Sequence, residues 1–168
     1  MSDPNINPYA SQTVSLEDDP RTGELASRWT RLWAALIDAL INMAYAIPLA
    51  FAFGTMQLAM KGQTPSFGTT LMLAGLGFLC FIAIHGYLLH TKGQTVGKSL
   101  LGIRIVSTSD QPVPLAQLLL RRYLPISVVA IIPVVGGILT VIDVLFIFRD
   151  DKRCIHDLIA DTKVVNAA

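Results

Sequence analysis

Cysteine and charge are both scarce in this chain. Cys80 lies within an apolar run and Cys154 in a basic segment; they are the only two cysteines, and no Cys-x-x-Cys pair occurs. This excludes a disulfide framework and gives no signal for a zinc site. Charged residues make up 15% of the sequence against 52% hydrophobic residues, and the mean hydropathy is +0.54. Soluble domains carry about a quarter charged residues, so much of this surface is expected to face lipid.

The motifs of common enzyme classes are also missing. Neither Gly-x-Ser-x-Gly nor His-Glu-x-x-His occurs, so we expect no enzyme, no cofactor and no metal. The segment at 93–99, GQTVGKS, has three residues rather than four between its first glycine and Gly-Lys-Ser, and it follows a membrane helix rather than a strand. It is therefore not a phosphate-binding loop. The basic residues are too dispersed for nucleic acid, so neither nucleotides nor nucleic acids are expected partners.

The N-terminal segment differs in composition from the rest of the chain. Residues 1–27 contain three prolines and five acids against one arginine, and they have no apolar periodicity. We predict a disordered, acidic, cytosolic tail, followed by one transmembrane domain at 28–165. Because the tail lacks a positive stretch followed by an apolar core, it is not a cleavable signal peptide. The first apolar run is therefore expected to stay in the protein.

Two apolar runs predict transmembrane helices. The first covers residues 32–53 and the second residues 67–89. At ~1.5 Å per residue each is long enough to cross a hydrocarbon layer of ~30 Å. Trp29 and Trp33 lie at the start of the first run, beside Arg28 and Arg31, an arrangement that anchors a helix end at the headgroup level.

A third apolar stretch, residues 124–148, admits two topologies. Its length allows one tilted crossing, as a single bent span. A turn at 133–137 would instead make it a helical hairpin, leaving Lys61 as the only Lys or Arg on the outer side, which the positive-inside rule favours. The hairpin needs a first leg that begins near Leu115, with Arg121 and Arg122 snorkelling or facing protein. Both termini are then expected inside.

The fold class follows from these segments. Residues 101–106 are expected to be extended or interfacial, 107–114 a loop, and 115–120 an amphipathic helix. The sequence therefore predicts an all-α integral membrane protein, a small bundle of two full spans plus the hairpin or single bent span. We expect it in a bacterial cytoplasmic (inner) membrane with its N-terminus in the cytosol. Because so few short helices enclose little volume, we expect a homo-oligomer.

One face of the first helix is polar. Arg31, Asp38, Asn42 and Tyr45 follow one another at spacings of seven, four and three residues, which places them on one side of a helix. A carboxylate about 10 Å inside the hydrocarbon boundary costs at least ~2.5 kcal/mol unless it is paired, protonated or hydrated. Asp38 is therefore either a proton- or cation-binding group or part of a polar lock between helices.

Three further candidates lie in or near the apolar runs. Asp143 would lie at a depth similar to Asp38 and could share a proton or cation with it, or else pair with Arg149 or an Arg of the first helix end. His85 near the end of the second helix could relay protons or donate a hydrogen bond to a neighbouring helix. His90 lies at that helix boundary.

Outside the apolar runs, basic and acidic residues suggest other roles. Lys98 and Arg104 are expected to contact anionic lipid headgroups. Asp157 follows a basic cluster and could cap a helix, pair with Arg104 or Arg153, or close a cytosolic gate.

Three segments resemble the RDD family of bacterial membrane proteins. They are RLWAALID at 31–38, GQTVGKSLLGIRIV at 93–106 and RCIHDLIADTKVV at 153–165, so the resemblance extends over residues 28–165. It places the family's arginine on Arg31 and its two aspartates on Asp38 and Asp157. Asp161 stands where the family pattern leads us to expect glycine. The resemblance implies a membrane role with a suspected transport function and no settled substrate.

Two functions fit these residues best, and a third, lipid handling at the cytosolic leaflet, rests only on the basic central loop. The first is a small transporter or exchanger of protons or monovalent cations, with Asp38, Asp143 and His85 as binding groups and Arg31 tuning the carboxylate. The second is a non-transporting scaffold or accessory subunit in which Arg31, Asp38 and Asp157 hold the fold together.

Overall fold

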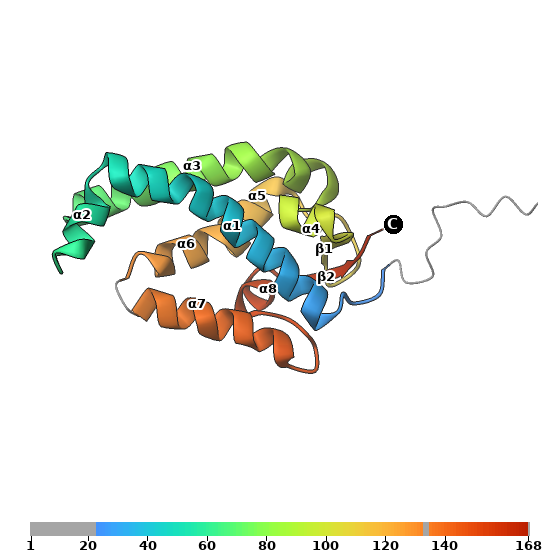
Figure 1. The fold of residues 1–168 in the computed structure, drawn as a ribbon. Coiled ribbons are helices and arrows are strands. Elements are labelled where there is room, and N and C mark those ends of the chain that lie inside the picture. The colour runs from blue at the N-terminus through green and yellow to red at the C-terminus, as the bar shows by residue number, and fades with distance from the viewer. Residues whose placement is uncertain (1–22, 133–134, 168) are drawn as a thin grey trace, which may run out of the picture.

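The two long apolar runs form the two long helices of the structure. The computed structural model describes residues 23–132 and 135–167, so most of the predicted acidic tail lies outside the described residues. Helix α1 (Arg28–Ala52) begins after Ser27, whose side chain accepts a hydrogen bond from the Thr30 N–H. Helix α3 (Phe67–Lys92) begins after Ser66 in the same way. These N-caps satisfy backbone donors that the first helical turn leaves free. The short helix α2 (Thr55–Met60) connects the two (Figure 1).

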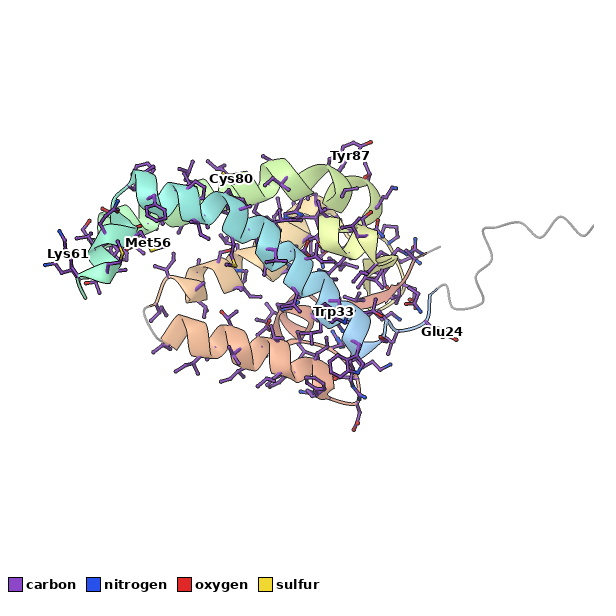
Figure 2. All side chains as sticks on the ribbon, viewed as in Figure 1. Glu24, Trp33, Met56, Lys61, Cys80 and Tyr87 are labelled. Carbon is purple, nitrogen blue, oxygen red and sulfur yellow. The ribbon has the colours of Figure 1, made fainter. Side chains whose placement is uncertain are left out.

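The outer surfaces of α1 and α3 are apolar and exposed. Both helices are long and apolar enough to cross a membrane. Only 6% of the most apolar 18-residue stretch of each helix is buried inside the protein. Large side chains therefore project outward from most of their length (Figure 2). A soluble monomer rarely exposes so much contiguous apolar surface, whereas a lipid-facing protein must.

A small antiparallel sheet lies at one end of the helices. After α4 (Val96–Leu100), strand β1 (Ile103–Ser107) pairs with β2 (Thr162–Asn166), with Ile105 opposite Val164. The prediction of extended chain at 101–106 is thus confirmed for residues 103–106, while Leu101 and Gly102 form a turn. An all-α fold class is incomplete, because β2 was not foreseen. Residues 23–26 add hydrogen bonds to the free edge of β2, so ordered structure begins before residue 28.

The third apolar stretch forms two separate short helices. The chain passes through α5 (Leu115–Gln117) and the π-helical segment η1 (Leu118–Tyr123) into α6 (Leu124–Ala130), then returns as α7 (Val135–Leu145). Figure 1 shows α6 and α7 lying side by side, and Gly136 packs so closely on α6 that a Cβ there would lie 2.4 Å from the Val129 carbonyl oxygen. Pro133, in the predicted turn, lies outside the described residues.

The buried core lies at the sheet end of the molecule. Its members come from the start of α1, the end of α3, η1 and both strands: Ala26, Ala34, Leu89, Ile103, Ile105, Val113, Leu118 and Val164. After the 3-10 turn η2 (Phe146–Phe148), the chain runs back into this end through α8 (Ile155–Ile159). The predicted motif residues therefore converge where the core is.

Candidate functional site

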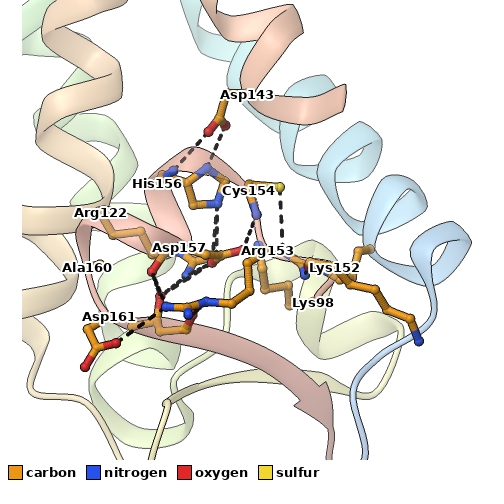
Figure 3. Close-up of polar contacts among 12 residues, drawn as sticks. Lys98, Arg122, Asp143, Lys152, Arg153, Cys154, His156, Asp157, Ala160 and Asp161 are labelled. Atoms are coloured by element: carbon orange, nitrogen blue, oxygen red, sulfur yellow. Dashed lines mark hydrogen bonds and ion pairs between the residues drawn. The ribbon is translucent and has the colours of Figure 1, made fainter. Parts of the chain in front are cut away.

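Asp157 is the centre of a buried ion-pair network. It is fully buried in the first turn of α8, where its carboxylate accepts a hydrogen bond from the Cys154 backbone N–H at 3.1 Å. The guanidinium groups of Arg31 from α1 and Arg122 from η1 both form ion pairs with it. Asp157 thus caps α8 as expected, but its ionic partners are Arg31 and Arg122 rather than Arg104 or Arg153. Figure 3 shows Asp157 with its neighbours Arg122, Cys154 and His156.

The charges in this network keep Asp157 ionised. Burial by itself would raise the pKa of the Asp157 carboxyl group, but the neighbouring guanidinium groups of Arg122 and Arg31 outweigh burial and hold this pKa well below its usual range. The result is one buried carboxylate between two guanidinium groups. Such a charge is strongly destabilising if its partners are removed, so this network locks α1, η1 and α8 together.

A second chain of hydrogen bonds links the network to α7. The His156 Nδ1 lies 2.6 Å from the Asp143 carboxylate and its Nε2 lies 3.1 Å from Arg122 Nη2. Because an arginine only donates, Nε2 must accept, so the ring is neutral with its proton on Nδ1 and donates to Asp143. Burial first, and then Arg122, lower the pKa of His156, which keeps the ring neutral. Asp143 therefore pairs with His156, and not with Arg149.

One group of possible metal ligands lies in this region. Ligand atoms of Asp143, Cys154 and His156 lie within 4.8 Å of one another. Both ring nitrogens of His156 are already engaged, and burial, together with Asp157, raises the pKa of Cys154 to about 11. A thiol with such a pKa is a poor metal ligand at neutral pH, because the thiolate is the binding form. This arrangement suits a hydrogen-bond network better than a cation.

Asp38 holds a different segment, which consists of Thr95 and the helix α4 that follows it. Its carboxylate accepts hydrogen bonds from the Thr95 hydroxyl at 2.5 Å and the Gly97 N–H at 2.8 Å. Lys98 Nζ lies 3.6 Å away and His85 Nδ1 lies 4.0 Å away. A Cβ on Gly97 would lie 2.3 Å from the Ala34 carbonyl oxygen, so only glycine allows α4 to approach α1 this closely.

A cavity runs from Asp38 toward the opposite end of the bundle. It measures about 600 Å³ and lies between the inner faces of α1, α3 and α6. On α1 its lining extends from Ala35 to Tyr45, about 15 Å of helix. Asn42 and Tyr45 line it, and the Tyr45 hydroxyl donates to Asn42 at 3.0 Å. Its inner end contains side chains of both charge signs: Asp38, Lys98, Arg122 and His156.

The structure thus divides the predicted polar face of α1 between two centres. Arg31 pairs with Asp157 and is not the group that sits against Asp38. Asp38, Asn42 and Tyr45, predicted to share one face of the helix, all line the cavity. Asp38 and Asp143 have separate partners, so no shared carboxylate pair is formed by their hydrogen bonds.

The remaining predicted residues lie at the sheet end of the structure. His85 is fully buried, and its Nδ1 accepts the Val96 N–H at 3.2 Å instead of donating to another helix. Lys98 faces Asp38, which departs from its predicted role as a free headgroup contact. Arg104 is exposed, as that role requires.

Sequence reasoning left the role of Arg122 open and did not single out Thr95. Arg122 is 1% exposed, whereas Arg121 is exposed. Arg122 is therefore the one of the two that faces protein. The sequence held part of the signal: Arg121 and Arg122 follow three leucines, and a basic side chain in such a segment must either reach water or find a buried partner. Nothing in the spacing alone identifies Asp157 as the partner of Arg122, because the two residues lie 35 positions apart in the sequence.

Asp161 shows why glycine is expected at its position. Its backbone has φ +53°, the left-handed conformation that glycine adopts without strain and that aspartate tolerates better than most residues. Its carboxylate also accepts a hydrogen bond from the Thr108 hydroxyl at 3.1 Å. The departure from the family pattern therefore leaves the turn intact.

Comparisons with known proteins agree with this geometry. The uncharacterized protein YckC of Bacillus subtilis is 32% identical over 142 residues, covering 84% of this chain and 85% of that protein. The uncharacterized membrane protein YteJ of Bacillus subtilis is 30% identical over 154 residues, 86% and 83% of the two chains. An uncharacterized protein of Haemophilus influenzae is 28% identical over 144 residues, 83% and 77%. No solved structure matches. The RDD family model matches residues 25–161, and with two exposed apolar helices and the Arg31, Asp38 and Asp157 centres in place, this chain belongs to the RDD family of membrane proteins.

Proposed function

We propose that this protein is a small transporter of the bacterial inner membrane that exchanges monovalent cations for protons, with Asp38 as the binding carboxylate. The observation that carries the proposal is that Asp38 lines the inner end of the cavity of about 600 Å³. A purely structural carboxylate needs no such access. Ionisable side chains that face a cavity between membrane helices are the usual markers of ion and substrate pathways in membrane proteins.

The neighbours of Asp38 suit reversible binding. Lys98 Nζ at 3.6 Å is close enough to stabilise the carboxylate but is not in tight contact with it. An incoming cation or proton competes with this ammonium group for the same oxygen atoms, as an exchange mechanism requires. Lys98 thereby takes the tuning role that the sequence had suggested for Arg31.

We further propose four crossings with both termini in the cytosol. Lys61, just after α2, lies at the end of the molecule away from the sheet (Figure 2). The other Lys and Arg residues that the structure describes lie at the start of α1, at the end of α3, in α4, β1, η1 and β2, and between η2 and α8. Basic residues favour the cytosolic side, which places the sheet and α8 there. The α6–α7 hairpin would then enter from that side and return to it.

The experiment is flux in sealed liposomes containing the purified full-length chain. A pulse of sodium or potassium ions is expected to move protons in the opposite direction, reported by an internal pH dye. Asp38→Asn keeps the acceptor for Gly97 and loses the charge, so flux should stop while folded yield stays near that of the parent. Asp110→Asn is the control, because Asp110 is exposed and pairs with Lys163 away from the cavity. If the parent protein moves neither protons nor alkali cations, the proposal fails.

The Asp157 network favours a second candidate, a scaffold or accessory subunit. It joins α1, η1 and α8 through charges that are almost completely buried, and it needs no transported ion. On this view, Asp38 is also a lock, holding α4 on α1. It predicts that Asp38→Asn lowers the amount of folded protein in the membrane. Normal abundance with lost flux would rule out the scaffold; lost abundance in a parent that shows no flux would favour it.

A further inference from the structure

A hollow of about 200 Å³ lies where α3 meets β1. Its lining includes His90 and Lys92 from the end of α3 and Arg104 from β1. Among the described residues, the side chains of these three bases make no hydrogen bond or ion pair, and all three are exposed. The one acid in the lining, Asp110, is already paired with Lys163 at 2.8 Å. The hollow therefore carries positive charge without a partner.

The hollow is at the height of the lipid headgroups. Helix α3 has 26 residues, so it is about 39 Å long and exceeds a hydrocarbon layer of ~30 Å. Its last turn, which carries His90 and Lys92, extends beyond the hydrocarbon. Tyr87, one turn earlier, is 76% exposed, as aromatic side chains at the membrane interface are.

Backbone geometry keeps this hollow in place. Gly93 has φ +64° and ends α3, and its carbonyl accepts the Ile105 N–H at 2.9 Å. A Cβ on Gly93 would lie 2.7 Å from the Ile105 carbonyl oxygen. The end of the helix is thus fixed against β1, so Lys92 and Arg104 are held on one hollow by separate elements.

From this placement we propose that the hollow binds the phosphate group of an anionic phospholipid in the leaflet on the sheet side. Basic pockets at the ends of membrane helices attract anionic headgroups, and each basic side chain near the surface contributes to the attraction. The acyl chains would continue along the exposed apolar surface of α3. This site is separate from the cavity at Asp38 and does not depend on transport.

The test is lipid binding to the purified full-length protein in neutral detergent, followed by native mass spectrometry and thermal unfolding. Phosphatidylglycerol should bind and raise the melting temperature more than phosphatidylcholine does. The double variant Lys92→Gln/Arg104→Gln should bind phosphatidylglycerol about 30-fold more weakly, at ~1 kcal/mol per base and ~1.4 kcal/mol per tenfold. Lys61→Gln/Arg121→Gln is the matched control, since it removes two exposed bases elsewhere and should keep the parent affinity.

Two results would overturn the proposal. One is a double variant that binds phosphatidylglycerol as tightly as the parent does. The other is soluble glycerol 3-phosphate competing as well as the lipid, which would make the hollow a site for free phosphate compounds. The milder variant Arg104→Lys retains the charge and should still bind phosphatidylglycerol more tightly than phosphatidylcholine. This variant keeps the proposal testable if the double variant does not fold.

Discussion

Replacing Asp157 with asparagine should destabilise the protein far more than any other acid-to-amide change in the described chain. The substitution keeps the shape of the side chain and its acceptor for the Cys154 N–H, but it leaves Arg31 and Arg122 without their common anion. Removing one partner of a buried ion pair costs about 3–5 kcal/mol, because the remaining charge is desolvated and uncompensated. The ratio of folded to unfolded protein should fall at least ~100-fold, at ~1.4 kcal/mol per tenfold.

The assay is reversible unfolding in mixed micelles of neutral detergent and dodecyl sulfate. The signal is the fluorescence of the two tryptophans, Trp29 and Trp33, at the start of α1. Asp151→Asn serves as the control, because Asp151 forms a partly exposed pair with Arg149 that should contribute at most ~1 kcal/mol. If Asp157→Asn unfolds within ~0.5 kcal/mol of the parent, the network is not a lock and the reasoning is wrong.

The pH dependence of this stability has a definite sign. The pKa of Asp157 is lower in the folded protein than in the unfolded chain, so the contribution is complete above the unfolded value of ~3.9. It is lost only as the pH falls below that value and approaches the folded pKa. Between about pH 5 and 8 the Asp157 contribution should therefore be constant, and a parent-minus-Asp157→Asn difference that varies strongly in that range would contradict the assignment.

Three further predictions concern other positions. Gly97→Ala should lower stability by about 1–3 kcal/mol because its Cβ would overlap the Ala34 carbonyl, whereas Gly75→Ala, which meets open space, should not; thermal unfolding compares them. The pKa of His156 is lowered on folding, so the melting temperature of the parent should fall as the pH drops from about 7.5 to 5.5, through the unfolded value of ~6.5. His156→Gln should weaken that dependence, and an equally steep fall in the variant would contradict it. Cys154 is buried with its pKa raised to about 11, so maleimide should label it only after unfolding, which mass spectrometry of the labelled peptide checks.

The sequence predicted the features that depend on composition and period. Two apolar helices, the extended segment at 101–106 and the break in the third apolar stretch all follow from local hydropathy and glycine or proline content. That Asp38, Asn42 and Tyr45 share one face of α1 follows from helical spacing alone, and that face lines the cavity. These features depend on residues close together in the sequence, and the tertiary contacts of the folded protein leave them as predicted.

The features that the sequence did not predict are pairings between distant segments. Strand β2 reads as part of a basic C-terminal segment, and it becomes a strand only because β1 offers it a partner. Arg31 was assigned to Asp38 because both lie on α1, yet its partner is Asp157, 126 residues away. Spacing within one helix says which residues share a face; it does not say what packs against that face.

Both polar centres are attached to α1, but they hold it to different elements and so have different consequences for function. Arg31 holds the start of α1 to α8, while Asp38, two turns further along, holds α4 and lines the cavity. A movement of α1 relative to α4 would change the contacts of Asp38 without breaking the Arg31–Asp157 pair, whereas loss of that pair would release both. The arginine and the second aspartate therefore act as the fixed support, and under the proposed exchange function Asp38 is the charged member of the set that would respond to an ion.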